Sequence, residues 1–206
     1  MNQELQIIID YVEGKSDIKD FRKEFLNNPS LIKVLKSKIY LECYKHYDYN
    51  IYDYFNRQID PAKSDWDTIY ARYVVWFDLK QFLNYNHIAF NDIYTKYNDD
   101  YDYLLDIQPS WLDIVDDQGI FDKIIAECPK DLSKTKRIAW GKARIKELFK
   151  YDKTYPRWIQ DPEWPIINGK PLVFSHQKKA GKDDERVYYY FYDPDTKEET
   201  IITQMY

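Results

Sequence analysis

The stretch that most constrains the fold lies near the C-terminal end of the chain. Residues 156–174, "PRWIQDPEWPIINGKPLVF", contain four prolines, two tryptophans and an Asn-Gly pair. Proline fixes its own φ angle and biases the preceding residue toward extended conformations, so this stretch is stiff and excludes a helix. The Asn-Gly pair predicts a tight turn that leads into a strand. Trp158 and Trp164 provide large apolar surfaces, which we expect to hold the stretch against a neighbouring core.

The chain before this stretch has apolar residues at helical spacing. The clearest pattern covers 64–86, "SDWDTIYARYVVWFDLKQFLNYN", with Ser64 or Asp65 expected as the residue that caps the helix. Further helices are expected at 4–14, 17–28, 29–35, 38–55, 91–107, 109–127 and 132–150. The helix over 109–127 would begin with a proline, which the first helical turn tolerates.

The pattern changes after Tyr151. Residues 169–177, "GKPLVFSHQ", predict one strand, and 185–206, "ERVYYYFYDPDTKEETIITQMY", predict two strands joined by a turn. The fold class is therefore α+β, with a helical region over 1–150 and a β module over 151–206. A three-stranded ribbon alone is marginally stable in water, so we expect it to pack on the helices as one continuous domain.

Composition restricts the kind of protein that this is. No apolar run approaches the roughly 18 to 20 residues of a membrane-spanning helix, and the first residues lack the pattern of a signal peptide. The cytoplasm is therefore the expected compartment. The two cysteines, Cys43 and Cys128, are expected to be reduced there.

Charge is unevenly distributed along the sequence. Residues 45–128 contain sixteen acidic and seven basic residues, whereas 129–157 contain ten basic and three acidic residues. Such segregation indicates either electrostatic steering of a partner or the docking of one part of the fold on another.

The C-terminal motifs resemble those of a known group of proteins. "PRWIQDPEWPIINGKPLVFSHQ" together with "YYYFYDPDTKEETIITQMY", about residues 155–206, is similar to a module of small bacterial proteins. Some of these proteins are encoded beside polymorphic or contact-dependent toxins and are interpreted as immunity proteins. The resemblance implies a binding protein that neutralises a toxin by covering it, without catalysis or a cofactor.

The acidic segment offers a surface for such a partner. A basic toxin would be attracted by carboxylates and anchored by aromatic rings. The candidate partner-binding residues are Asp99, Asp100, Tyr101, Asp102, Tyr103, Asp106, Trp111, Asp116 and Asp117. The alternative is a solvated helix face with its loops. The spacing does not fit a calcium-binding loop, because the sixth position lacks glycine and the twelfth lacks glutamate.

The basic segment supports a second hypothesis, nucleic-acid binding. Lysines and arginines interleaved with Trp140 and Phe149 on one helix would contact phosphates. The candidate residues are Lys136, Arg137, Lys142, Arg144 and Lys146. The sequence pI of about 5.3 argues against this hypothesis, and docking on the acidic helices would equally explain the segment.

Metal binding and catalysis have little support in the sequence. Cys43 and His46 have a spacing that suits two metal ligands, but only Cys128, His87 and His176 remain as further soft ligands. The chain has no Gly-x-Ser-x-Gly motif and, with five glycines, no glycine-rich phosphate loop. We therefore expect a protein without catalytic residues, metal or cofactor.

Overall fold

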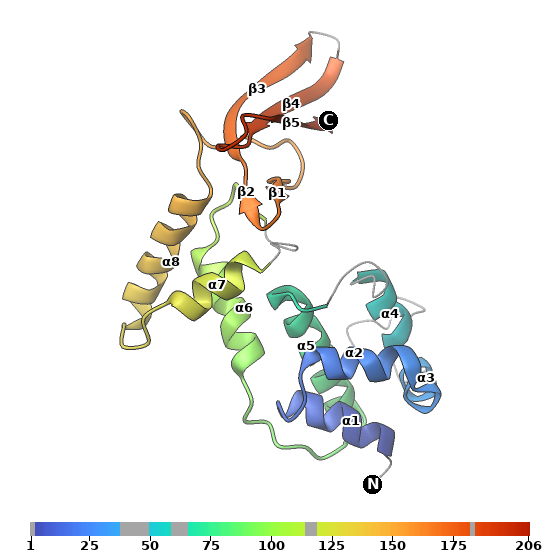
Figure 1. The fold of residues 1–206 in the computed structure, drawn as a ribbon. Helices are drawn as coiled ribbons and strands as arrows, with labels where there is room; N and C mark the ends of the chain where they lie inside the picture. Colours follow the sequence, from blue (N-terminus) through green and yellow to red (C-terminus); the bar gives the residue numbers. More distant parts are fainter. Residues whose placement is uncertain (1–2, 38–49, 59–65, 114–118, 182–183) are drawn as a thin grey trace. The chain divides into compact units, whose positions relative to one another are not determined.

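The computed structural model describes residues 3–37, 50–58, 66–113, 119–181 and 184–206. Over these residues the fold is α+β, as predicted, with eight helices followed by a small antiparallel sheet (Figure 1). The chain forms two compact units, Met1–Tyr101 and Asp102–Tyr206. In the described part of the chain, no helix has the length and apolar character needed to cross a membrane.

The boundary between the two compact units does not coincide with the change from helices to strands. It falls within helix α6, Lys96–Ile107, so the last helix before the sheet belongs to the same unit as the sheet. The reason is a shared aromatic core: Phe149, at the end of that helix, lies 5.5 Å from Trp164 of the proline-rich stretch, between ring centroids.

The first unit is helical. Its helices are α1 Gln3–Val12, α2 Ile18–Asn27, α3 Pro29–Lys36, α4 Ile51–Gln58, α5 Ile69–Tyr85 and the first residues of α6. Helix α5 is buried on several sides, since its buried residues include the consecutive Val74, Val75 and Trp76. Its N-cap is Thr68, whose Oγ1 accepts a hydrogen bond from the amide of Ala71. The prediction that Ser64 or Asp65 caps this helix is therefore wrong.

Aromatic rings build the core of the first unit. Phe25 is fully buried and lies 4.7 Å from Tyr52 and 4.8 Å from Trp66, between ring centroids. Tyr11 is also fully buried, stacks on Phe21 at 5.0 Å, and donates its hydroxyl proton to the carbonyl of Arg72. Tyrosines of this unit therefore contribute to the buried core as well as to the surface.

The helices of the second unit are the remainder of α6, α7 Ile120–Glu127 and α8 Lys134–Leu148. The prediction of one helix over 109–127 is wrong in its first part. The amide of Leu112 donates to the carbonyl of Pro109 in a turn, and α7 begins only after Gly119, which adopts a φ of 78°. A residue in this left-handed conformation cannot continue a helix from the preceding residues.

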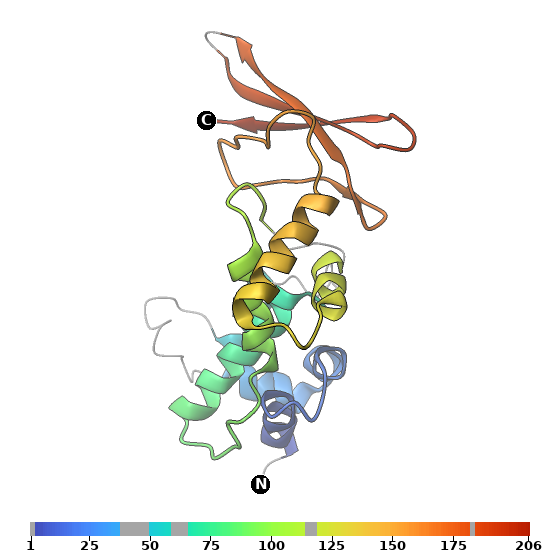
Figure 2. The same ribbon diagram turned by 90° about the vertical axis from the view of Figure 1, so that its left-hand side faces the viewer.

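The strands follow the predicted order. β1 Ile166–Ile167 and β2 Lys170–Pro171 form a short hairpin around the Asn-Gly turn. β3 Val173–Gly181, β4 Asp184–Tyr192 and β5 Glu199–Met205 form an antiparallel sheet with the order β3-β4-β5. Figure 2 shows these three strands as a strongly twisted ribbon.

The proline-rich stretch covers one face of this sheet. Along β4, residues Val187, Tyr189 and Phe191 are buried and alternate with more exposed tyrosines. Trp158 packs on Tyr189 with 4.4 Å between centroids, and Trp164 meets Phe191 at 5.3 Å. Both tryptophans therefore hold the stretch against the core, as predicted, and they supply the second layer that the sheet needs.

Candidate functional site

Helix α6 has a carboxylate side and a buried side. Asp99, Asp102 and Asp106 are exposed and recur at the spacing of one helical stripe, whereas Tyr103 and Ile107 are buried. The structure thus brings part of the predicted partner-binding set together on one side of one helix. Asp116 and Asp117 lie outside the described residues.

Several of these carboxylates already interact within the chain. The hydroxyl of Thr95 donates to Asp99 at 2.8 Å, and Lys96 forms an ion pair with Asp100 one turn away. In the second unit, Lys134 lies 3.5 Å from Asp106. These exposed pairs contribute little to stability, but they reduce the negative charge that a basic partner would meet.

The aromatic residues that were predicted to anchor a partner mainly pack against other residues of the chain. Tyr101 stacks on Tyr73 at 4.2 Å. The hydroxyl of Tyr103 donates to the carbonyl of Arg137 at 2.8 Å. Burial, together with a hydrogen bond to the thiol of Cys128, raises the pKa of Tyr103. Tyr103 and Trp111 are each only 8% exposed, so neither ring stands on the acidic surface as an anchor.

The basic residues of α8 fall into two groups. In the first group, the guanidinium of Arg137 lies over the ring of Tyr103, and Arg144 forms ion pairs with Glu127 and Glu147. The contacts with Tyr103 of α6 and Glu127 of α7 connect α8 to its neighbours, in line with the docking interpretation of the basic segment. Phe149 is completely buried and is not available to a nucleic acid.

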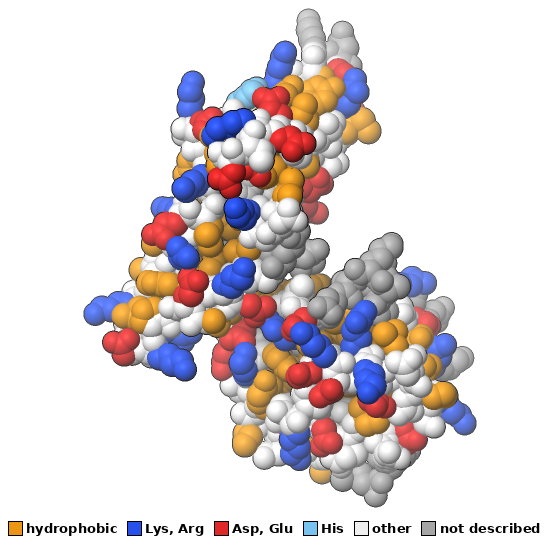
Figure 3. Space-filling view, viewed as in Figure 1, with side chains coloured by type: hydrophobic (Ala, Val, Ile, Leu, Met, Phe, Trp, Pro, Cys, Tyr) orange, Lys and Arg blue, Asp and Glu red, His pale blue; other side chains and the backbone are white. Residues whose placement is uncertain are grey.

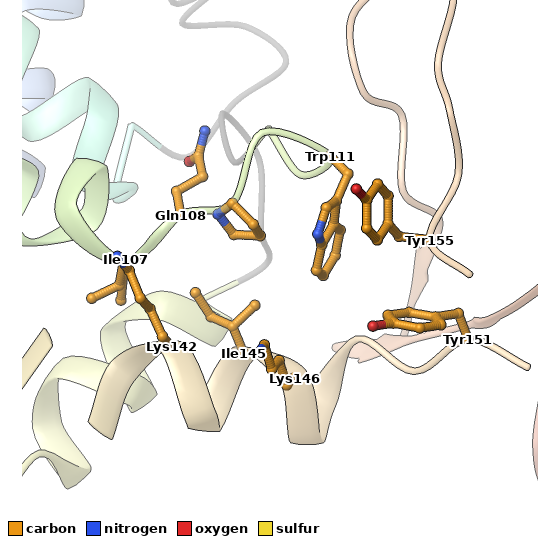
Figure 4. A pocket seen from close by; sticks show the side chains of 9 residues that line it. Ile107, Gln108, Trp111, Lys142, Ile145, Lys146, Tyr151 and Tyr155 are labelled. Atoms are coloured by element: carbon orange, nitrogen blue, oxygen red, sulfur yellow. The ribbon is translucent and has the colours of Figure 1, made fainter. Parts of the chain in front are cut away.

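The second group faces a cavity of about 400 Å³ within the second unit. Lys142 and Lys146 project from successive turns of α8, with the buried Ile145 between them (Figure 4). Within the described residues, neither lysine forms an ion pair. We call this site the tyrosine-lysine cleft; its lining residues are Ile107, Gln108, Pro109, Trp111, Lys142, Ile145, Lys146, Tyr151 and Tyr155.

Three aromatic rings form the wall of the cleft opposite Lys142. Trp111 and Tyr155 are nearly parallel, with centroids 5.8 Å apart and planes 17° apart. Tyr151 stands almost perpendicular to Tyr155, at 81° and 6.2 Å. Tyr151 is 36% exposed and Tyr155 46%, so both rings offer free surface to a ligand (Figure 4).

Backbone pairing fixes this wall. The amide of Phe174 donates to the carbonyl of Lys150 at 2.9 Å, and the amide of Asp152 donates to the carbonyl of Phe174 at 3.0 Å. These bonds pair Tyr151 with β3 in a parallel bridge. On the other side, the indole nitrogen of Trp158 donates to the carbonyl of Trp111 at 2.9 Å. The rings are therefore held in place by the sheet and the proline-rich stretch.

Of the aromatic wall, only Trp111 was among the predicted partner-binding residues, and the wall as a whole was not predicted as a site. Tyr151 and Tyr155 carry a weak signal in the sequence, since two tyrosines four residues apart directly follow the basic helix. Nothing in the sequence brings Trp111 and the end of α6 to the same place. Figure 3 adds that basic, acidic and hydrophobic side chains are mixed on the surface over α8, without a broad field of one sign.

Metal binding finds no candidate in the described part of the chain, where no group of three or more His, Cys, Asp or Glu side chains is arranged to hold an ion. Cys43 and His46 lie outside the described residues. Cys128 is a buried free thiol beside Tyr103.

Comparison with known proteins identifies no relative: no family model, no curated protein and no solved structure matches this chain. The resemblance of about residues 155–206 to immunity proteins therefore stays a prediction.

Proposed function

We propose that this chain is a binding protein without catalysis, and that the tyrosine-lysine cleft receives its ligand. One observation carries the proposal. At one cavity, Lys142 and Lys146, which form no ion pair with the described residues, lie together with the exposed rings of Tyr151 and Tyr155. A cavity of about 400 Å³ is within the size range of ligand sites.

The lining determines the chemistry of the ligand. Two ammonium groups one helical turn apart attract a negative group and lose little by accepting one, because no carboxylate of the described residues occupies them. The rings and Ile145 favour an apolar or planar group beside that charge. The ligand is thus an anion that carries an aromatic or apolar part.

The same lining favours binding over reaction. The nine residues include no carboxylate, imidazole or thiol. Lysine and tyrosine can also act as bases or nucleophiles, but we assign those of the cleft to binding. The compartment that we propose for this activity is the cytoplasm, which the sequence predicts.

Calorimetric titration with small probes tests the proposal. Phenyl phosphate combines a ring with a negative charge, whereas phenol and glycerol phosphate each supply one of the two features. We expect phenyl phosphate to bind with a dissociation constant on the order of millimolar, and the other two to bind at least about fivefold more weakly. Lys146→Ala should weaken phenyl phosphate binding by about threefold to tenfold.

Lys136→Ala is the matched control, because Lys136 is an exposed lysine of the same helix that does not line the cleft. Equal losses in Lys136→Ala and Lys146→Ala would indicate charge attraction without a site. Absence of binding by all three probes would refute the proposal.

A second candidate function is the covering of a basic protein, such as a toxin, by the carboxylate side of α6. The exposure of Asp99, Asp102 and Asp106 along one stripe supports it. The test is a pull-down from the source cell at about 0.15 M salt, where surface charges are screened beyond about 8 Å. Recovery of one basic protein in near-stoichiometric amounts, and its loss after reversal of these three charges to lysine, would favour this candidate. The cleft proposal predicts no effect of the reversal on phenyl phosphate.

A further inference from the structure

Three lysines lie at or next to the cleft in the sequence. Lys142, Lys146 and Lys150 recur every fourth residue and are all exposed. The two lysines within α8 lie about 6 Å apart along the helix axis, because a helix rises about 1.5 Å per residue. Lys150 lies beyond the end of α8 at Leu148, after the C-cap Phe149, and precedes Tyr151 of the aromatic wall. Several exposed cations close together in the chain suit a ligand with repeated negative charges better than a single carboxylate.

The rings beside these lysines are arranged for stacking. Tyr151 and Tyr155 are nearly perpendicular to one another, so their exposed faces point in different directions. Trp111 lies parallel to Tyr155 and supports it from one side. Nucleobases stack on such rings with little dependence on their identity, because every base has a π face. The hydroxyls of the tyrosines and the amide of Gln108 supply hydrogen-bond partners at the same cavity.

We propose that the occupant of the cleft is a single-stranded nucleic acid. One base stacks on the face of Tyr155 that Trp111 leaves open at the edge of the cleft, and its neighbouring phosphates meet Lys142, Lys146 and Lys150. This inference rests on the proposed function, of which it names the ligand class. It differs from the sequence-based hypothesis in its aromatic partners, which are Tyr151 and Tyr155 instead of Trp140 and Phe149.

A single strand fits this geometry better than a duplex. The stacking surfaces line a cavity, and the bases of a duplex are already stacked on one another and cannot enter it without being unpaired. On the face that Figure 3 shows, basic and acidic side chains are mixed over α8, whereas recognition of a duplex depends on a broad basic face. RNA and DNA strands both offer bases and phosphates to the cleft, and the experiment below distinguishes between them.

Fluorescence anisotropy with labelled ten-nucleotide strands, dT10 and rU10, tests the inference, with a ten-base-pair duplex alongside. We expect a single strand to bind at least about tenfold more tightly than the duplex. Tyr155→Ala should weaken strand binding by about tenfold without changing its salt dependence. Lys146→Ala should instead make the negative slope of log association constant against log salt concentration shallower by about 0.7. This is the value for one phosphate contact on a single strand.

Two controls accompany these variants. Tyr206→Ala removes a tyrosine ring that is 64% exposed and does not line the cleft, and Lys136→Ala removes a lysine outside it. Both should leave strand binding within about twofold of the original protein. Circular dichroism and thermal melting establish that Tyr155→Ala and Lys146→Ala remain folded, as expected for exposed side chains.

The outcomes separate this inference from the proposed function. If phenyl phosphate and an acidic aromatic peptide bind at the cleft but neither strand does, the nucleic-acid inference is overturned and the proposed function stands. If no probe, peptide or strand binds, both fail. Equal affinity for strand and duplex, or strand binding that Tyr155→Ala leaves intact, would also overturn the inference. Preference for rU10 over dT10 would support it and identify RNA as the source.

Discussion

The hydroxyl oxygen of Tyr103 lies 2.6 Å from the position that a Cβ atom would occupy on Gly141. Ile107 approaches the same position, with its Cγ2 atom at 2.7 Å. Helices α6 and α8 can therefore meet at this point only because residue 141 has no side chain. This contact explains a glycine in the middle of a helix, where glycine otherwise costs about 1 kcal/mol relative to alanine.

The first prediction is that Gly141→Ala destabilises the second unit. The gain in helix propensity of about 1 kcal/mol should be outweighed by an overpacking cost of about 1 to 3 kcal/mol. The net loss in free energy of unfolding is measured by guanidinium denaturation. Tyr103→Phe removes the nearest atom, so the effect of Gly141→Ala should be smaller in the double variant. A stabilised Gly141→Ala protein would contradict the close approach of the helices.

The second prediction concerns Trp164, which contacts the rings of Trp111, Phe149, Phe174 and Phe191. Trp164→Ala should lower the free energy of unfolding by about 3 to 5 kcal/mol, because it leaves a large cavity between the sheet and α8.

The matched control is Trp140→Ala on the partly exposed side of α8, which should cost clearly less. The change is followed by chemical denaturation monitored by far-ultraviolet circular dichroism. Similar losses in the two variants would show that Trp164 is not central to this core.

The third prediction concerns the turn between β1 and β2. Asn168 and Gly169 both have positive φ angles, 52° and 71°. Gly169→Ala should lower stability by about 1 to 2 kcal/mol, because a left-handed conformation strains a residue with a side chain. No atom lies within 4 Å of the added Cβ, so the cost is conformational and not a clash.

Asn168→Gly serves as the control for this turn, since glycine adopts the same conformation freely, and its effect should stay below about 1 kcal/mol. Thermal melting of the two variants under the same conditions provides the comparison. A larger loss from Asn168→Gly than from Gly169→Ala would argue against this turn.

The fourth prediction is a loss of stability at alkaline pH. Burial and the neighbouring Tyr97 raise the pKa of Tyr11 well above its ordinary value of 10.0, and burial likewise raises the pKa of Tyr97. Because these pKa values are higher in the folded state than in the unfolded state, their stabilising contribution is complete below about pH 10 and declines as the pH rises above it.

Urea denaturation of the protein between pH 8 and pH 11 measures this decline. Tyr11→Phe should lose about 1 kcal/mol at pH 8, from the hydrogen bond to the carbonyl of Arg72, and should show a shallower decline above pH 10. Tyr85→Phe, which changes a ring that is 45% exposed, should behave like the original protein. An identical alkaline decline in Tyr11→Phe would rule out a contribution from Tyr11.

Local sequence signals were sufficient for much of the secondary structure. The Asn-Gly turn, the β-branched and aromatic residues of β4 and the apolar spacing of α5 are each properties of a few adjacent residues, and the structure agrees with them. The helix expected over 109–127 failed because its apolar residues have helical spacing, whereas Gly119 adopts a left-handed conformation that interrupts it.

The candidate site was harder to predict from the sequence than the secondary structure. Aromatic content alone does not distinguish a buried Tyr103 from an exposed Tyr155, because both rings have the same chemistry and only tertiary contacts separate them. The cleft also depends on Trp111, which lies more than thirty residues before Lys142, and on the pairing of Tyr151 with Phe174. Such long-range pairings leave no local pattern in the sequence.

The bridge between Tyr151 and Phe174 connects the cleft mechanically to the start of β3. A ligand that requires Tyr151 in its present position binds only while this bridge is closed, so occupancy and opening of the bridge are thermodynamically linked. The amide protons of Phe174 and Asp152, which form the bridge, should therefore exchange with solvent deuterium more slowly as ligand is added. Hydrogen exchange at these two amides thus reports on the cleft from within the sheet.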